Sequence, residues 1–102
     1  MDTKVIKGLV DTYKFNVAKE IVKSLEGQKA CYTVCTSGSD VVVNLYDIHE
    51  RWIGYVHIKD NEIRVIYNDW SYLDCFCGID QTDKAVRAVK DIIDYSIEQE
   101  KQ

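Results

Sequence analysis

The sequence contains no proline and five glycines among its 102 residues. Neither a glycine-rich phosphate loop nor a Gly-x-Ser-x-Gly nucleophile motif occurs. The lack of proline excludes nothing by itself, because biased composition of the coding genome explains it as well as structure does. A Cys-x-x-Cys redox pair and the nuclease pattern of a strand acid followed by Glu-x-Lys are also missing. These absences predict a protein that is not an enzyme.

Membrane-spanning and secretory segments are absent as well. No apolar run approaches the length needed to cross a bilayer, and residues 1–10 lack the apolar core and cleavage site of a signal peptide. We therefore expect an intracellular protein. Its 46% hydrophobic and 29% charged residues are ordinary for a globular chain. A length of 102 residues suffices for one domain, 1–102, whose core needs no cofactor, metal or disulfide.

The net charge of −4 is unevenly distributed. Residues 1–29 carry six lysines against four acidic residues, whereas residues 30–79 carry three basic and seven acidic ones. An acidic central region argues against nucleic-acid binding, which requires phosphate charges to be neutralised. The alternative is a nucleic-acid-binding protein that uses the lysines of its first helix, which are Lys4, Lys7, Lys14, Lys19 and Lys23. More often such lysines simply solvate a helix.

The central stretch 31–67 has the pattern of two β-hairpins in tandem. β-Branched and aromatic residues dominate four short runs, and Ser, Gly, Asp and Asn interrupt them where turns are needed. The pattern predicts strands at 31–35, 41–46, 52–58 and 63–67, with turns at 37–40 and 59–61. Alternation predicts one face as core, with Val41, Val43 and Leu45 from one strand and Ile63, Val65 and Tyr67 from another. The other face mixes aromatic and polar residues, which a fully solvated face would not need.

Two helices flank the hairpins. Apolar residues at helical spacing predict helices over 3–26 and 82–99, and Gly27 is placed to end the first in a left-handed conformation. Gly8 and residues 13–16 are weak points where the first helix could break. A fifth, edge strand is expected at 72–77, and an ordered loop that brings Trp70 back onto the sheet is the alternative. The fold expected is α+β, with an antiparallel sheet of four or five strands and both terminal helices packed on one face.

A weak internal repeat accompanies this order. At an offset of 21 residues, Tyr46-Asp47 falls on Tyr67-Asn68, and the two turns also align. A helix-hairpin unit packed against a hairpin-helix unit would create a pseudo-two-fold seam in the middle of the sheet. Chance resemblance between hairpins explains the pattern equally well. If the repeat is real, the seam is a natural place for a groove.

The four cysteines offer one candidate site. Cys31 and Cys35 would share one strand face, as would Cys75 and Cys77, so four sulfurs could converge on a metal if the two strands were neighbours. These spacings are not those of zinc knuckles, and burial of free cysteines as small apolar residues is the more common outcome. A disulfide between the two pairs is a further alternative for a hyperthermophile protein.

A second candidate is Asp47-x-His49-Glu50 together with His57, which could bind a metal or carry out acid–base chemistry. Residues 47–50 fall in the connection between the hairpins, however, where acids and histidine are ordinary. His57 alternates with Tyr55 along a strand and would face water. We expect these residues to have structural roles.

The surplus of aromatic residues is more informative. Two Trp, seven Tyr and two Phe occur in the chain, many of them between residues 46 and 76 and close to Arg51 and Arg64. Such residues are enriched in binding surfaces, because they give large contact area at low entropic cost, although filling the second face of a thin sheet is an equal alternative. The predicted partner-binding residues are Tyr46, Arg51, Trp52, Tyr55, Arg64, Tyr67, Trp70 and Tyr72.

These features predict a non-enzymatic module that binds a protein or peptide in a groove or along a sheet edge. It is also expected to form a homodimer, because exposed strand edges need cover. A nucleic-acid binder, or a cysteine-based metal or redox protein, is the alternative.

Two resemblances bear on this prediction. The order of elements is similar to that of double-stranded RNA-binding domains, but residues 81–84, Gln-Thr-Asp-Lys, lack the basic cluster that begins their last helix. The compact strands VVVNLY and IRVIY, with cysteines in a short, motif-free chain, resemble the small orphan proteins of viruses that infect hyperthermophilic archaea, such as the Acidianus filamentous viruses. That resemblance implies no activity. It implies a location in the host cytoplasm or the virion.

Overall fold

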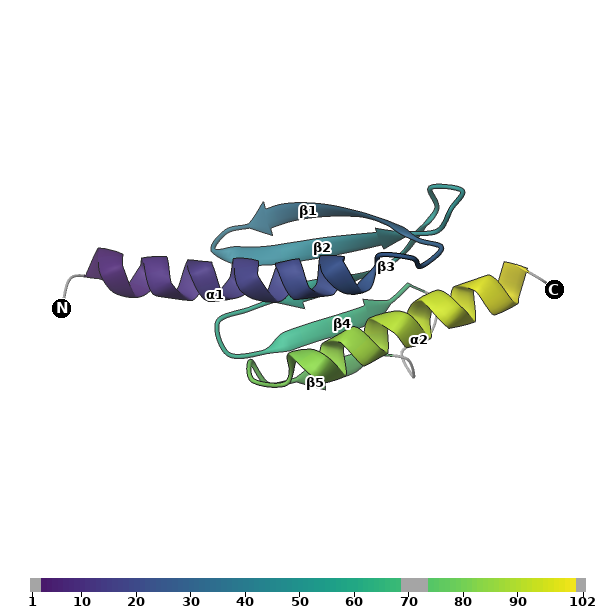
Figure 1. Ribbon diagram of the computed structural model, residues 1–102. Helices are drawn as coiled ribbons and strands as arrows, with labels where there is room; N and C mark the ends of the chain where they lie inside the picture. Colours follow the sequence, from purple (N-terminus) through teal and green to yellow (C-terminus); the bar gives the residue numbers. More distant parts are fainter. Residues whose placement is uncertain (1–2, 69–73, 101–102) are drawn as a thin grey trace.

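The computed structural model contains two helices and a five-stranded antiparallel sheet, which confirms the predicted α+β fold (Figure 1). It describes the backbone of residues 3–68 and 74–100, and the side chains of residues 13–68 and 74–100. The elements are α1 (Thr3–Ser24), β1 (Cys31–Ser37), β2 (Asp40–Tyr46), β3 (Trp52–Ile58), β4 (Ile63–Tyr67), β5 (Cys75–Cys77) and α2 (Thr82–Glu100).

The strands lie in the sheet in chain order, each antiparallel to the next. The predicted turn at 37–40 joins β1 to β2, and Gly38 there has a φ of 63°, which glycine adopts without steric cost. The fifth strand is shorter than predicted: β5 begins at Cys75, and residues 72–73 lie outside the described part. β1 and β5 consequently form the two opposite edges of the sheet.

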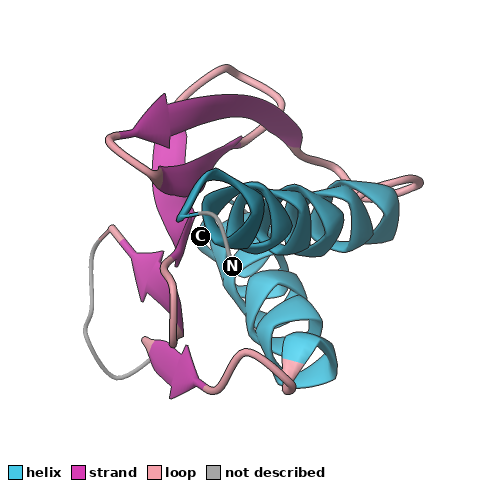
Figure 2. Ribbon diagram, turned by 90° about the vertical axis from the view of Figure 1, so that its left-hand side faces the viewer, coloured by secondary structure: helices cyan, strands magenta, loops and turns pink. Residues whose placement is uncertain are grey.

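Both helices cover the same face of the sheet, as expected, and together they make a two-layer structure (Figure 2). The helical spacing of apolar residues places Val17, Ile21 and Leu25 of α1 against the strands. The buried residues of α2 are Ala85, Ala88, Val89, Ile92 and Ile93. From the sheet, the alternating residues predicted as core are buried beneath them.

The first helix runs without the break that Gly8 and residues 13–16 suggested. Two long-range contacts hold the second of these weak points in helical form. The Tyr13 hydroxyl donates to the Ile79 carbonyl oxygen at 2.9 Å, and the Lys14 ammonium donates to the Ser39 carbonyl oxygen at 2.6 Å. Tertiary contacts therefore outweigh the local preference. As predicted, Gly27 follows the helix in a left-handed conformation, with a φ of 80°.

Candidate functional site

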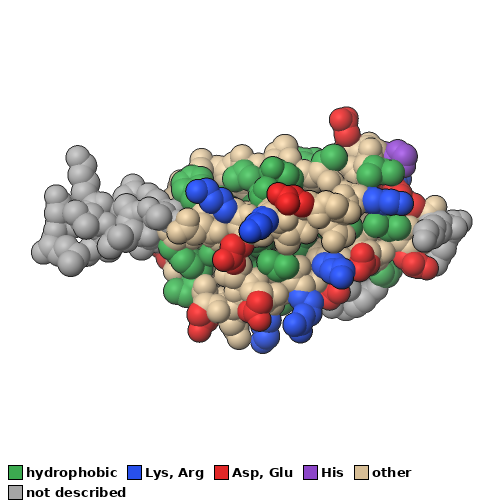
Figure 3. Space-filling model, in the orientation of Figure 1, with side chains coloured by type: hydrophobic (Ala, Val, Ile, Leu, Met, Phe, Trp, Pro, Cys, Tyr) green, Lys and Arg blue, Asp and Glu red, His purple; other side chains and the backbone are tan. Residues whose placement is uncertain are grey.

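The face of the sheet opposite the helices is covered by no element of the described chain (Figure 2). We call it the outer face. Cross-strand pairing assigns to it Cys31, Thr33 and Cys35 of β1, Val42, Asn44 and Tyr46 of β2, Trp52, Tyr55 and His57 of β3, Arg64 and Ile66 of β4, and Phe76 of β5. Most of these side chains are aromatic, aliphatic or uncharged polar groups. The outer face therefore differs from the helical face, where basic and acidic side chains interleave (Figure 3).

A β-bulge brings two aromatic rings together on the outer face, near the point where β2 ends and β3 begins. Leu45 pairs with Gly54 but Tyr46 pairs with Trp52, so β3 has one residue more than β2 at this point. In a regular strand, residues 52 and 55 would lie on opposite faces. The additional residue places Trp52 on the same face as Tyr55, and the two rings stack with centroids 5.9 Å apart and planes 8° from parallel. Trp52 nevertheless remains 41% exposed.

Polar side chains on the neighbouring strands fix this stack in place. The Trp52 indole Nε1 donates to Asn44 Oδ1 at 3.3 Å, and Asn44 Nδ2 lies 3.6 Å from Cys35 Sγ. Tyr46 is 3.4 Å from the hydroxyl of Thr33. Because the ring positions are already fixed, binding a partner would cost little side-chain entropy.

The charged groups of the outer face are paired with one another. Arg64 Nε donates to Glu62 Oε1 at 2.9 Å, and the guanidinium carbon lies 5.7 Å from the centroid of the Phe76 ring. His57 Nε2 lies 2.9 Å from Asp40 Oδ2. The outer face therefore has little unbalanced charge with which to attract an ionic ligand.

Four of the predicted partner-binding residues, Tyr46, Trp52, Tyr55 and Arg64, lie on the outer face. Arg51 lies at its end, where it pairs with Asp47 and Glu100. Tyr67 lies instead on the core face, where it is buried and makes an edge-to-face contact with Tyr95, the ring centroids being 5.5 Å apart. Strand alternation with Ile63 and Val65 is the physical reason. Tyr67 also lines a pocket of about 300 Å³ together with Arg51 and Trp52. The predicted residues Trp70 and Tyr72 fall outside the described residues.

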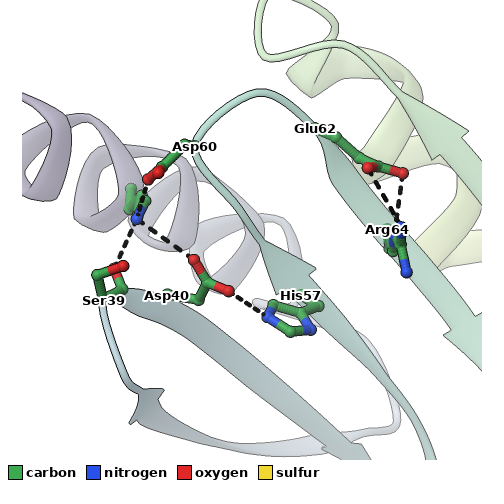
Figure 4. Close-up of polar contacts among 7 residues, drawn as sticks. Ser39, Asp40, His57, Asp60, Glu62 and Arg64 are labelled. Carbon is green, nitrogen blue, oxygen red and sulfur yellow. Dashed lines mark hydrogen bonds and ion pairs between the residues drawn. The ribbon is translucent and has the colours of Figure 1, made fainter.

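A buried lysine forms a second polar cluster at one end of the sheet, between α1 and the two hairpin turns. Lys14 is fully buried, and its ammonium lies 2.6 Å from the Ser39 carbonyl oxygen, 3.4 Å from Asp40 Oδ1 and 2.5 Å from Asp60 Oδ1. Figure 4 shows Asp40 extending toward His57, while Asp60 approaches from the other turn. Burial alone would lower the pKa of Lys14, but the bonds to Asp60 and Asp40 together raise it. Lys14 therefore stays charged, and the cluster joins α1 to both turns.

Asp47 organises the connection between β2 and β3. Its Oδ1 accepts the backbone N–H groups of His49 at 2.8 Å and Arg51 at 2.9 Å, and its Oδ2 accepts Arg51 Nε at 2.7 Å. His57 pairs instead with Asp40, and His49 lies 3.6 Å from a Glu100 carboxylate oxygen. The acid–base candidate of Asp47, His49, Glu50 and His57 is therefore not assembled, and Asp47 has the structural role expected.

Acid should weaken the fold through Asp47 and Asp40. Burial alone would raise the pKa of each carboxyl, but hydrogen bonds from Arg51 and His49 to Asp47, and from His57 and Lys14 to Asp40, lower it below its usual value of 3.8. A lowered pKa stabilises the fold above the pKa of the unfolded chain, and this contribution disappears as pH falls through the folded value.

We therefore expect the urea midpoint to be level between about pH 5 and 7 and to fall below about pH 4. The variant Asp47→Asn should flatten this fall and should be less stable than the wild type at pH 7. A wild-type midpoint that does not change between pH 6 and pH 3 would contradict the assignment.

The cysteines do not form a common site. Cys31 and Cys35 are exposed on the outer face of β1, whereas Cys75 and Cys77 are on the core side of β5, at the opposite edge. Four sulfurs cannot converge from opposite edges, and a disulfide between the pairs within one chain is excluded for the same reason. Burial as small apolar residues holds for Cys77, where it raises the pKa of the thiol to about 11, but it is wrong for Cys31 and Cys35. Within the described residues no three metal-ligating side chains are grouped.

An apolar groove of about 440 Å³ between α1 and β1 was not predicted. Its walls are Phe15, Ala18, Val22, Tyr32 and Val34, and its charged rim is Lys19, Lys23 and Glu26. Phe15, Tyr32 and Val34 are each more than 40% exposed. By contrast, the pocket between α1 and α2 measures about 50 Å³, far below the size of a typical ligand site. The sequence shows that Tyr32 and Val34 alternate along the strand. It does not show that α1 leaves both side chains uncovered.

The nucleic-acid alternative loses one of its lysines. Lys14 is buried in its ion-pair cluster, whereas Lys19 and Lys23 are exposed at the rim of the groove. The side chains of Lys4 and Lys7 fall outside the described part. None of the helices within residues 3–68 and 74–100 has the length and apolar character that a membrane span requires. Comparison of the chain with protein-family models, with curated proteins and with solved structures finds no match.

Proposed function

We propose that this protein is a non-enzymatic interaction module that binds a segment of another protein on the outer face of its sheet. The observation that carries the proposal is the stack of Trp52 on Tyr55 on that face. Tyr46 and Ile66 lie beside the stack on the two neighbouring strands. Rigid, partly exposed aromatic rings surrounded by aliphatic and uncharged polar groups are typical of the residues that contribute most to protein–protein binding.

The chemistry of the face favours a protein segment with apolar side chains over a nucleic acid. Arg64 is paired with Glu62 and His57 with Asp40, so phosphate groups would find few uncompensated cations. An apolar segment would instead displace water from the Trp52 and Phe76 rings and leave these ion pairs intact. If the chain comes from an archaeal virus, the partner is a protein of the host or of the virion.

Removal of the indole at position 52 should weaken partner binding. We expect Trp52→Ala to lower affinity roughly ten-fold or more, because a central aromatic residue of an interface commonly contributes about 1.4 kcal/mol or more. The matched control is Ile79→Ala, since Ile79 is also 41% exposed but lies between β5 and α2.

The measurement is quantitative capture of partner from an extract of the source cells by each immobilised variant. Loss with Trp52→Ala and retention with Ile79→Ala is expected. Equal capture by both variants would contradict the proposal. Retention on heparin at low salt, lost as salt rises, would favour the nucleic-acid alternative.

A further inference from the structure

The two edges of the sheet are built differently. β5 has only three residues, with Asp74 just before it and Asp80 shortly after it. A short edge strand with charged residues nearby is commonly protected against pairing with another chain. β1 has seven residues, all exposed and none charged. It pairs with β2 on one side, and no described segment pairs with its other side. The chain thus protects one edge and leaves the other suited to strand pairing.

We propose that β1 pairs antiparallel with β1 of a second copy of this chain, around a two-fold axis near Val34. The sheet would then continue across the seam, with all four helices on one side. The β1 edge, as distinct from the outer face, is the surface involved, so this inference goes beyond the proposed function.

The sequence of β1 is compatible with pairing to itself. With Val34 on the axis, all seven residues find partners and each pair lies on one face of the sheet, because the paired positions differ by an even number. The pairs are Val34 with Val34, Thr33 with Cys35, Tyr32 with Thr36, and Cys31 with Ser37. No like charges face each other along the strand, although the whole chain carries −4.

The same axis would cover the apolar groove. Tyr32 and Val34 of β1 point to the helical side of the sheet, where they are 45% and 43% exposed. Phe15 of α1, which faces them across the groove, is 45% exposed. In the dimer, the groove of the second copy would lie next to the groove of the first, on the same side of the sheet. The exposed apolar side chains of the two copies would then fill the space between their α1 helices. A foreign strand would pair with the edge but need not supply matching apolar groups, so a second copy is the occupant that the chain itself provides.

The size of the seam sets its strength. A standard interface buries about 800 Å² and about 20–30 residues on each partner. The seam offers the seven residues of β1, five residues of α1, and Glu26 just after the helix. This is about half of a standard interface, so we expect a concentration-dependent dimer with a dissociation constant on the order of micromolar.

Analytical ultracentrifugation of the full chain tests the proposal. The wild type should shift from monomer to dimer as its concentration rises through the micromolar range. Val34→Lys should remain monomeric, because two like charges would face each other at the axis. Phe76→Lys, which places the same charge on the edge strand β5 at an exposed position, should dimerise like the wild type. Circular dichroism checks that both variants are folded. A monomeric wild type at all concentrations, or equal dimerisation of Val34→Lys, overturns the proposal.

Cysteine crosslinking locates the axis. In a Cys31→Ser, Cys35→Ser parent, adding Val34→Cys should give a covalent dimer when diamide oxidises the two facing thiols and is itself reduced. Ser37→Cys in the same parent should crosslink much less, and the parent, which keeps Cys75 and Cys77, should not crosslink. If Ser37→Cys crosslinks as readily as Val34→Cys, the seam assigned here is wrong. Neither result changes the expectation for partner binding at Trp52, so the two proposals fail separately.

Discussion

Replacement of Lys14 by methionine is expected to lower the free energy of unfolding by about 2–3 kcal/mol. Lys14 is fully buried, and its ammonium contacts Asp40, Asp60 and the Ser39 carbonyl oxygen. Methionine fills a similar volume, but it removes the ammonium from the partly buried carboxylate of Asp40, which then keeps only its contact with His57. Loss of one partner from a buried pair commonly costs about 3–5 kcal/mol, and we expect less here because Asp60 is 69% exposed and screened by solvent.

Urea denaturation at pH 7 measures this change. With a slope of about 1–1.5 kcal/mol per molar for a chain of this size, the midpoint should fall by roughly 2 M. The control is Lys19→Met, because Lys19 is exposed on the same helix and should change the free energy by less than about 0.5 kcal/mol. Equal midpoints for both variants would show that the cluster does not join α1 to the turns.

Substitution of Gly54 by alanine should have an effect of similar or greater size. A Cβ atom at this position would fall far inside van der Waals contact of the Ile66 carbonyl oxygen on the neighbouring strand. Backbone cannot rotate away as a side chain can, so β3 and β4 must separate near Gly54. Overpacking typically costs about 1–3 kcal/mol, and we expect about 3 kcal/mol or more here because the clash is with main chain.

Thermal and urea unfolding of Gly54→Ala should be compared with those of Gly78→Ala. At Gly78 the added Cβ would meet a side-chain oxygen of Asp80 at 3.0 Å, which can move aside. We therefore expect Gly78→Ala to cost less than about 1 kcal/mol. The intrinsic fluorescence of Gly54→Ala should also change, because Trp52 lies in the same bulge. A Gly54→Ala protein as stable as the wild type would contradict the close contact between Gly54 and the backbone of β4.

The hairpins and helices could be predicted from the sequence because local patterns determine them. The alternation of Val41, Val43 and Leu45 identified the core face of β2, and the turn around Gly38 has the residue types that hairpins require. The continuity of α1 could not be predicted, since it depends on Tyr13 and Lys14 reaching residues distant in the sequence.

The aromatic stack on the outer face could be predicted from composition but not from strand geometry. Trp52 and Tyr55 were correctly grouped, yet a regular strand would have placed them on opposite faces. The isolated Gly54 within a strand was the signal of a bulge that could have resolved this. Tyr67 was grouped with them because it is aromatic, although its alternation with Val65 placed it in the core. The groove beside β1 depends on where α1 lies across the sheet, which no local pattern specifies.

Binding of a partner protein to the outer face, as proposed, predicts crosslinks from that face and none from the solvent-exposed side of α2. Photo-crosslinking in the source cells tests it most directly, with benzoylphenylalanine in place of Tyr55 or Phe76 on the outer face and in place of Lys90 on the exposed side of α2. We predict the same discrete protein adduct from positions 55 and 76, its loss when Trp52→Ala is added, and no such adduct from position 90. An adduct from position 90 with none from 55 or 76 would contradict the account.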